Sequence, residues 1–290
     1  MTCQFQHVQS VLITGASGSF GQAFTRHLLT NNLAERICIY SRGEHRQADM
    51  RKSFNDDDRL RFFIGDVRDK VRLRRAMEGV EVVVHAAALK RIEAVQYNVL
   101  EAVKTNIDGT ANVVECAIDA GVRRSVLLST DKACEPTTIY GYTKAVAEAI
   151  FLNAASYVGD KVSRFAVTRY GNVAGSQGSV IPLWQQLKAA GITTVPVTDP
   201  DCTRFWMTLA EAVDLVRLAI KHGDNGSNLF TPLSLPAYRL GDLAEAMGLQ
   251  MRIMGLRNDE KLHESMRPGE PSNQARRLTI EEIKCRIETL

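Results

Sequence analysis

Side chains with acid and base functions gather in residues 127–144, which read LLSTDKACEPTTIYGYTK. Among its side chains are the hydroxyl of Thr130, the carboxylate of Asp131, the amines of Lys132 and Lys144, and the phenol of Tyr140. Its pattern predicts the end of a buried strand, a polar turn and the first turns of a helix. Tyr140 and Lys144 are four residues apart and therefore share one face of that helix. If the chain binds a nicotinamide cofactor, we expect the chemistry here.

A glycine-rich turn near the N-terminus is the candidate cofactor site. Residues 8–14 (VQSVLIT) form an apolar run that leads directly into GASGSFG and then into an amphipathic segment. Strand, glycine turn and helix form the context in which such a motif binds a dinucleotide, with the pyrophosphate at the helix N-terminus. A plain surface turn is the alternative. The candidate cofactor residues of this turn are Gly15, Ser17, Gly18, Ser19, Phe20 and Gly21.

The end of the second expected strand, residues 36–40, favours NADP over NAD. NAD-binding folds place an acidic residue near this point to bind the ribose 2′-hydroxyl. Here Ser41 and Arg42 follow the strand, and Arg46 comes a turn later. Guanidinium groups suit a 2′-phosphate. The alternative is a solvated basic loop.

Alternation of apolar runs with helical patterns predicts an α/β fold. Further strands are expected at 60–65, 81–86, 125–129 and 163–170, and long helices at 98–121 and 140–156. The pattern indicates a Rossmann-like, doubly wound parallel sheet. Glycine and proline punctuate the chain after Gly171. We expect an NADP-binding domain at 1–175 that also carries the catalytic residues. Residues 176–290 are expected to form mostly a small substrate-binding subdomain, with some segments returning to the main sheet.

Bulk composition excludes several classes of protein. The 290 residues are 45% hydrophobic and 24% charged, with a net charge of +3, which does not call for nucleic acid. The six cysteines form no CxxC pair and no Cys/His metal spacing, so we expect reduced thiols and no metal. No segment approaches the roughly 18 apolar residues of a membrane span, and no signal peptide is evident. We therefore expect a cytoplasmic protein.

The glycine turn TGxxGxxG and the YxxxK pair together resemble the extended short-chain dehydrogenase/reductase family. The resemblance is closer to one branch of it, the inverting UDP-N-acetylglucosamine 4,6-dehydratases, which open routes to pseudaminic acid and related 6-deoxy-amino sugars. It covers roughly residues 8–266. The motifs are GASGSFG, YSRGEHRQ, GDVRD, HAAALK, KTNIDGT, STDKA, IYGYTK, RYGNVAGSQGSVIP, TRFWMTL and EKLHE. A retaining branch replaces the tyrosine, so Tyr140 places the chain with the inverting enzymes.

The resemblance implies a role for each group of the first segment. Tyr140 as phenolate takes the 4-hydroxyl proton while hydride leaves C4 for NADP, and Lys144 lowers the pKa of Tyr140 and binds the nicotinamide ribose. Thr130 hydrogen-bonds the same hydroxyl. Lys132 is assigned mainly to the C5 proton and Asp131 to the C6 leaving group. The hydride returns to C6, so the cofactor stays bound between turnovers.

Other site residues also follow from the resemblance. Additional cofactor residues are Asp66, Val67, Ala86, Ala87, Ala88, Lys90 and Asn106. Substrate residues are Lys90, Tyr170, Asn172, Val180, Thr203, Arg204, Arg257 and Glu260, of which the cations suit an anionic UDP-sugar. For Lys90, Arg204 and Arg257 a purely structural role is the alternative. His85 and His263 are expected to be structural.

The chain departs from the family pattern in two places, which keeps other outcomes open. Asn258 and Asp259 replace a Pro-Gly pair before EKLHE, and Cys134 and Glu135 replace the usual small residue and Asn. The alternatives are a 5,6-dehydratase, a 4-keto-sugar oxidoreductase, a 4-epimerase or a non-catalytic NADP-binding regulator. We also expect a homo-oligomer, from dimer to hexamer, associated through helices 98–121 and 140–156.

Overall fold

A seven-stranded sheet forms the centre of the computed structural model, which describes residues 7–159, 163–223 and 228–290. Its strand order is β10-β6-β5-β4-β1-β2-β3, and every neighbouring pair is parallel. The strands are β1 (Val8–Thr14), β2 (Ala34–Ser41), β3 (Leu60–Ile64), β4 (Val82–His85), β5 (Arg124–Leu128), β6 (Arg164–Thr168) and β10 (Leu229–Phe230). The predicted doubly wound Rossmann-like sheet is confirmed.

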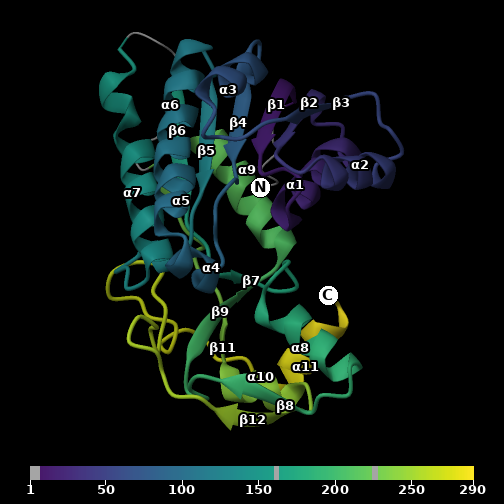
Figure 1. Cartoon of the computed structure of the whole chain (residues 1–290), viewed down its shortest axis with the longest axis vertical. Helices are drawn as coiled ribbons and strands as arrows, with labels where there is room; N and C mark the ends of the chain where they lie inside the picture. The colour runs from purple at the N-terminus through teal and green to yellow at the C-terminus, as the bar shows by residue number, and fades with distance from the viewer. Residues whose placement is uncertain (1–6, 160–162, 224–227) are drawn as a thin grey trace.

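Helices cover both faces of this sheet (Figure 1). The first face carries α1 (Ser19–Thr30), α2 (Glu44–Ser53) and α9 (Leu209–His222), whose apolar residues join one buried cluster. The second face carries α3 (Lys70–Met77), α6 (Gly109–Asp119) and α7 (Ile139–Asn153), with a second cluster. Asp69 caps α3 as its position predicts, since its side chain accepts from Arg72 N–H. Burial on both faces explains why the strands are continuously apolar.

The long helix expected at 98–121 is divided in the structure. A short helix α4 (Ile92–Tyr97) precedes α5 (Val99–Ala102), and a π-helical segment, Val103–Asp108, separates α5 from α6. The helix ends as predicted before Gly121, which adopts a φ of 67°. Apolar periodicity does not reveal a π-helical insertion because the same face stays buried. Such insertions often occur beside functional sites.

The second lobe has its own small sheets and core. Strands β7 (Asn172–Val173), β9 (Thr203–Met207) and β11 (Ala237–Arg239) form one sheet, and β8 (Thr194–Val197) pairs with β12 (Gln250–Ile253). Helices α8 (Val180–Ala189), α10 (Leu240–Ala246) and α11 (Ile280–Glu288) surround a core that includes Trp184, Trp206 and Tyr238. A capping box of Thr279 and Glu282 opens α11.

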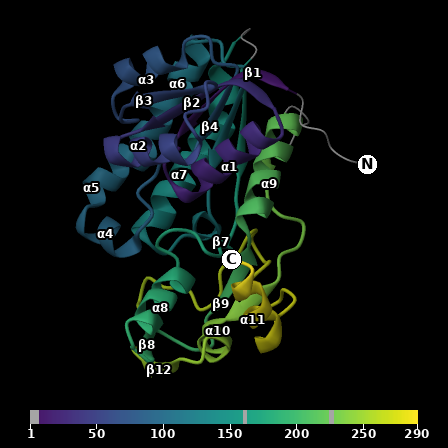
Figure 2. The ribbon, with the colours of Figure 1, turned by 90° about the vertical axis from the view of Figure 1, so that its right-hand side faces the viewer.

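Two segments after residue 176 belong to the main sheet rather than to the small lobe. Strand β10 pairs with β6, and α9 packs against β5, β6 and α1. Figure 2 shows α9 rising from the lower lobe beside α1. This helix therefore ties the two lobes together. Within the described residues, no helix is long and apolar enough to cross a membrane.

Candidate active site

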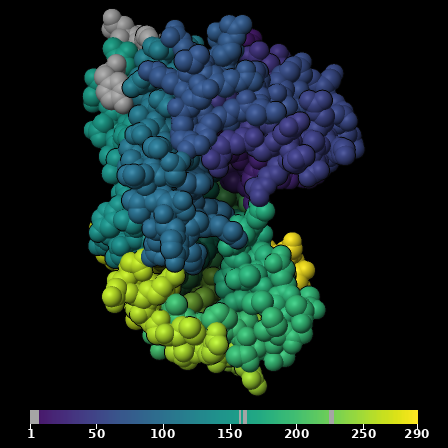
Figure 3. All heavy atoms as spheres, in the orientation of Figure 1, coloured from purple at the N-terminus to yellow at the C-terminus, as the bar shows by residue number. Residues whose placement is uncertain are grey.

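A cleft of about 1310 Å³ opens at the carboxyl ends of the sheet strands, where the second lobe faces them. Residues that follow β1, β2, β3, β4, β5 and β6 all line it, as do residues of the second lobe. Figure 3 shows the surface hollowed where the purple N-terminal region meets the green segment around α8. Ligands of open parallel sheets bind at this edge.

The glycine turn has the geometry that a diphosphate requires. Gly15 has a φ of 67°, and a Cβ built on it would lie 2.8 Å from the Ala87 nitrogen. Among the residues that the structure describes, no side chain caps α1, and the first turn of this helix holds no acidic residue. The amide groups of that turn lack intrahelical partners and lie at the cleft, so they suit an anionic group. The residues present therefore fit a dinucleotide phosphate.

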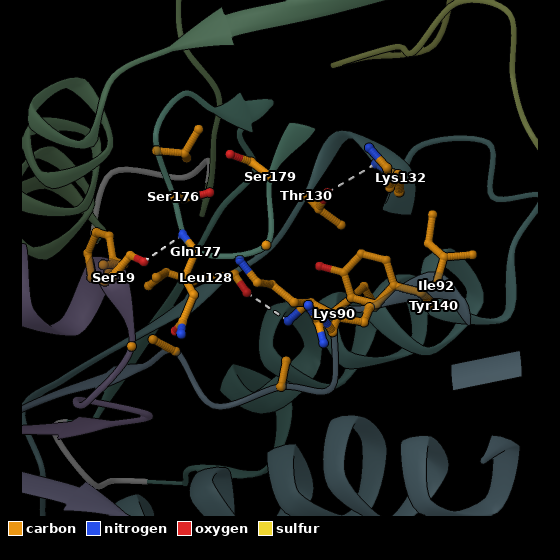
Figure 4. A pocket seen from close by; sticks show the side chains of 18 of the residues that line it. Ser19, Lys90, Ile92, Leu128, Thr130, Lys132, Tyr140, Ser176, Gln177 and Ser179 are labelled. Atoms are coloured by element: carbon orange, nitrogen blue, oxygen red, sulfur yellow. Dashed lines mark hydrogen bonds between the residues drawn. The ribbon is translucent and has the colours of Figure 1, made fainter. Parts of the chain in front are cut away.

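Helix α7 places Tyr140 and Lys144 in the cleft wall, where Figure 4 shows Tyr140 beside Thr130 and Lys132. Thr138 caps the helix by accepting from Gly141 N–H at 3.0 Å. Lys144 Nζ donates to the carbonyl of Leu128 at 2.7 Å. Burial lowers the pKa of Lys144 to about 8, although Glu148 opposes this. The ammonium is thus held at the end of β5.

The residue whose charge most strongly lowers the pKa of Tyr140 is not the one that we expected. Burial raises the pKa of this phenol to about 12, and the largest lowering influence is the charge of Lys132. Lys144 was expected to have this effect. In the structure its ammonium is directed to a main-chain carbonyl instead. The charge that opposes the effect of burial on Tyr140 therefore comes from the turn after β5.

The turn after β5 forms a short 3₁₀ helix, Asp131–Ala133, and Asp131 and Lys132 of this turn form a charged cluster with Glu264 of the second lobe. Lys132 Nζ is 3.2 Å from Asp131 Oδ1, 3.2 Å from Glu264 Oε1 and 3.2 Å from Asn172 Oδ1. Thr130 Oγ1 donates to Asp131 Oδ1 at 3.0 Å. Asp131 is fully buried, so its carboxyl reaches the cleft only through these neighbours.

The pKa values of Asp131 and Lys132 are both raised, but by different causes. Burial raises the pKa of Asp131, with a further contribution from Glu264 and opposition from Lys132. Burial disfavours the ammonium of Lys132, but the two carboxylates outweigh burial and raise the pKa of Lys132. Lys132 is thus held as a cation in this structure. A role as base requires that it first give up a proton.

Most of the site residues predicted from the sequence line the cleft. The exceptions are Asp131, Asn106 and Thr203, which lie behind its wall. Those that line it are Gly15, Ser17, Gly18, Ser19, Phe20, Gly21, Ser41, Arg42, Arg46, Asp66, Val67, Ala86, Ala87, Ala88, Lys90, Thr130, Lys132, Tyr140, Lys144, Tyr170, Asn172, Val180, Arg204, Arg257 and Glu260.

Asn106 and Thr203 support the wall rather than face a ligand. The amide of Asn106, in the π-helical segment, bonds both the N–H and the carbonyl of Leu89 and also Thr143 Oγ1. It thereby fixes the loop after β4. Thr203 Oγ1 bonds His263 Nδ1 at 2.8 Å and Ser272 Oγ at 2.6 Å, and so ties β9 to the C-terminal segment.

Cations of the second lobe are arranged around Glu260. Arg204 Nη2 donates to Glu260 Oε1 at 3.0 Å, and Arg257 Nε lies 3.6 Å from Oε2. The unusual Asp259 accepts from Gln96 of α4 at 2.5 Å through its side chain. Its carbonyl accepts from Thr137 Oγ1 at 2.8 Å. The departure from Pro-Gly thus gives this loop a side-chain contact with the other lobe.

Several cleft residues were missed by the sequence reasoning. Glu264, Lys261 and Tyr238 line the cleft, and so do residues 176–179. The N–H of Gln177 donates to Ser19 Oγ at 2.9 Å, which joins the second lobe to the glycine turn (Figure 4). Glu264 lies in the EKLHE motif, so its motif position was a signal. Among the described residues, no group of three or more His, Cys, Asp or Glu is placed to hold a metal ion.

The fold and the Tyr-Lys pair at the cleft define a short-chain dehydrogenase/reductase architecture. Residues 11–283 match the polysaccharide biosynthesis protein family, and the chain belongs to that family. It is 45% identical over 260 residues to a Campylobacter jejuni UDP-N-acetylglucosamine 4,6-dehydratase (inverting), covering 89% of this chain and 77% of that protein. This relative confirms the resemblance to the inverting dehydratases.

The chain is also similar to a protein named as an epimerase and to a solved bacterial structure. The chain is 40% identical over 269 residues to a protein named UDP-glucose 4-epimerase from Rickettsia rickettsii, with 89% of this chain and 77% of that protein covered. The solved structure of Pen from Bacillus thuringiensis superposes with a TM-score of 0.91 at 31% identity and covers 99% of this chain and 100% of its own. Sugar-nucleotide dehydratases and epimerases thus share this framework.

Proposed function

We propose that the protein is a UDP-N-acetylglucosamine 4,6-dehydratase that inverts C5. The observation that carries the proposal is that two pairs meet at one cleft, where Asp131 lies behind the wall and contacts Thr130 of the lining. Tyr140 and Lys144 come from α7, and the Asp131–Lys132 pair comes from the turn after β5. The first pair suits oxidation of an alcohol and the second suits loss of water. The Campylobacter relative named for this reaction supports the same conclusion.

In this mechanism side chains of the protein remove or donate protons at three positions of the sugar, namely the 4-hydroxyl, C5 and the C6 hydroxyl. Bound nicotinamide would accept the hydride of C4 and later return it to C6. Tyr140 takes the proton of the 4-hydroxyl, and the ketone formed at C4 acidifies C5–H. Lys132 in its neutral form removes that proton. Asp131 protonates the departing C6 hydroxyl through the Thr130 hydroxyl, because Thr130 lies 3.0 Å from Asp131 and lines the cleft.

We propose NADP as the cofactor. Arg42, directly after β2, and Arg46, in the first turn of α2, both line the cleft where a ribose 2′-phosphate would lie. Calorimetric titration should give tighter binding of NADP⁺ than of NAD⁺. Replacing both arginines by alanine should raise the Kd for NADP⁺ about 10-fold or more and change that for NAD⁺ less. Lys52→Ala, at an exposed position of α2, is the control. Equal affinity for both cofactors in the wild type would refute the choice.

Incubation with UDP-N-acetylglucosamine without added reductant tests the reaction itself. Mass spectrometry should show loss of one water, and NMR should show a 4-keto, 6-deoxy product inverted at C5. A product of unchanged mass with inverted C4 would instead establish a 4-epimerase, the activity for which the Rickettsia relative is named. Absence of turnover with bound NADP would indicate a regulator. The product class further implies a route to pseudaminic acid-like sugars.

A further inference from the structure

Glu264 is a buried carboxylate in the cleft wall that the reaction scheme above does not use. The residue is 3% exposed and lines the cleft. Its Oε1 lies 3.2 Å from Lys132 Nζ and its Oε2 lies 3.4 Å from Lys261 Nζ. Its main chain exchanges hydrogen bonds with Ser272, which holds the side chain in place. Burial of a carboxylate is costly unless the charge is paired, so this placement is specific.

Glu264 completes the set of acceptors around Lys132. An ammonium group has three donors, and three oxygens lie 3.2 Å from Nζ: Asp131 Oδ1, Asn172 Oδ1 and Glu264 Oε1. The position and direction of the Lys132 side chain are therefore fixed from both lobes. Loss of Glu264 would leave one donor direction unsatisfied and the amine less well placed beside Asp131.

The charged groups that face Glu264 shift its pKa in the opposite direction from that of Asp131. Lys132 faces it from the turn after β5, Arg204 from β9 and Lys261 from its own segment. Burial raises the pKa of Glu264, but these three cations outweigh burial and hold that pKa below its usual value. Burial raises the pKa of Asp131. Two carboxyl groups whose pKa values are shifted in opposite directions take different roles. A proton shared between them is therefore held by Asp131 rather than by Glu264.

We propose that Glu264 is a positioning residue for the elimination, which anchors Lys132 against Asp131 and stays ionised so that the ammonium proton passes to Asp131. The inference rests on the proposed function. An N–H bond of Lys132 breaks and an O–H bond forms on Asp131 across 3.2 Å. Glu264 acts only through Lys132 and takes no proton itself.

The elimination then balances. Lys132 takes the C5 proton, and the C5–H electron pair becomes the C5–C6 double bond. The proton of Asp131 passes through Thr130 to the C6 hydroxyl, which leaves as water with the C6–O electron pair. Lys132 ends as the ammonium and Asp131 as the carboxylate, which is the state from which the cycle began.

The substitution Glu264→Gln tests this role because it keeps the shape and removes the charge. We expect kcat for water loss to fall about 10- to 100-fold, with KM within about twofold of the wild type. Oxidation at C4 should persist, seen as near-ultraviolet absorbance of reduced nicotinamide on mixing. The pH profile of kcat should move to lower pH, because the charge of Glu264 raises the pKa of both Lys132 and Asp131.

Glu264→Asp separates charge from position. It keeps the charge on a shorter side chain, so kcat should fall while the pH profile stays at its wild-type position. Glu270→Gln is the matched control, since Glu270 is exposed and pairs only with Arg267 among the described residues, at 3.6 Å. If Glu264→Gln fails to fold in a thermal melt, the aspartate variant decides, and a wild-type kcat for it would overturn the proposal.

Other outcomes have separate meanings. Wild-type kcat and an unmoved pH profile in Glu264→Gln would overturn the positioning role. Loss of C4 oxidation together with water loss in both variants would make Glu264 a structural residue and also overturn it. Absence of water loss in the wild-type protein would instead refute the proposed function, so water loss by the wild type is measured first.

Discussion

At the scale of single residues, Thr130 connects a fully buried carboxyl group to the cleft. Its hydroxyl contacts Asp131 Oδ1, while Asp131 itself has no exposed surface. Asp131 Oδ2 is buried without a hydrogen-bond partner among the described residues. A carboxyl group in this environment needs a relay to act on a substrate hydroxyl.

Thr130→Val should therefore slow water loss about 100-fold, because it removes the relay hydroxyl while it keeps the shape. Thr130→Ser, which retains the hydroxyl, should stay within about fivefold of the wild type. Rates are measured by mass spectrometry of the product. Equal rates for the valine and serine variants would show that Asp131 acts without the hydroxyl.

Lys144 should make the stability of the protein depend on pH. Its pKa falls from 10.5 to about 8 through burial. Between these values the unfolded chain holds a proton that the native protein has lost, so the unfolded state binds more protons and stability rises with pH. Below about pH 8 both states are protonated, and the native state bears the cost of a buried charge.

Urea unfolding of the wild type and of Lys144→Met across that interval measures the effect. The free energy of unfolding of the wild type should rise relative to that of the variant by on the order of 3 kcal/mol from about pH 8 to 10.5. Parallel pH dependence in the two proteins would mean that Lys144 keeps an ordinary pKa in the folded state.

At the scale of elements, the first turn of α7 is packed directly on the turn after β5. A Cβ built on Gly141 would lie 2.4 Å from the Lys132 carbonyl oxygen and 3.1 Å from Pro136 Cβ. The backbone contact sets the distance between the Tyr140–Lys144 pair and the Asp131–Lys132 pair. The helix cannot approach the turn this closely with any other residue at this position.

Gly141→Ala should consequently destabilise the protein by about 1–3 kcal/mol and lower turnover, since α7 must move away from Lys132. The reciprocal change at an exposed position of the same helix, Ala149→Gly, should cost about 1 kcal/mol through helix propensity and leave turnover unchanged. Chemical unfolding and product formation are measured for both. A fully active Gly141→Ala would contradict the close packing.

At the scale of the whole molecule, exposed apolar side chains gather on helices α4, α5 and α7. Tyr97 is 91% exposed, Leu100 72%, Tyr142 53% and Val146 43%. Helices α4 and α5 both contact α7, so the helices that carry these residues lie next to one another (Figure 1). An apolar surface of this kind indicates association with another protein surface. A homo-oligomer associated through helices 98–121 and 140–156 remains our prediction, and the exposed side chains of α4 lie next to them.

Light scattering of the wild type should accordingly give at least twice the 32.1 kDa mass of one chain. Leu100→Glu combined with Val146→Glu should give a smaller species, because buried charges destabilise an apolar contact. Leu233→Glu, at a fully exposed position of the loop between β10 and β11, should leave the mass unchanged. A monomeric wild type would refute the prediction.

The sequence alone determined the sheet, the glycine turn and the Tyr140–Lys144 pair. These features depend on local patterns, namely apolar runs, glycines at a strand end and a four-residue helical spacing. The sequence also placed Arg42 and Arg46 at the end of β2. It did not predict the π-helical segment, because one extra residue in a buried helix leaves the apolar periodicity nearly intact.

Only the tertiary structure determines which charged side chains are in contact. Glu264 is 132 residues from Lys132 in the chain, yet their side chains are in contact because the second lobe folds back over the strand ends. Asp131 is fully buried, and the packing of α7 on β5 directs Lys144 to the carbonyl of Leu128. Protonation in the cluster depends on burial and on neighbouring charges, and both arise only when distant segments of the chain are brought together.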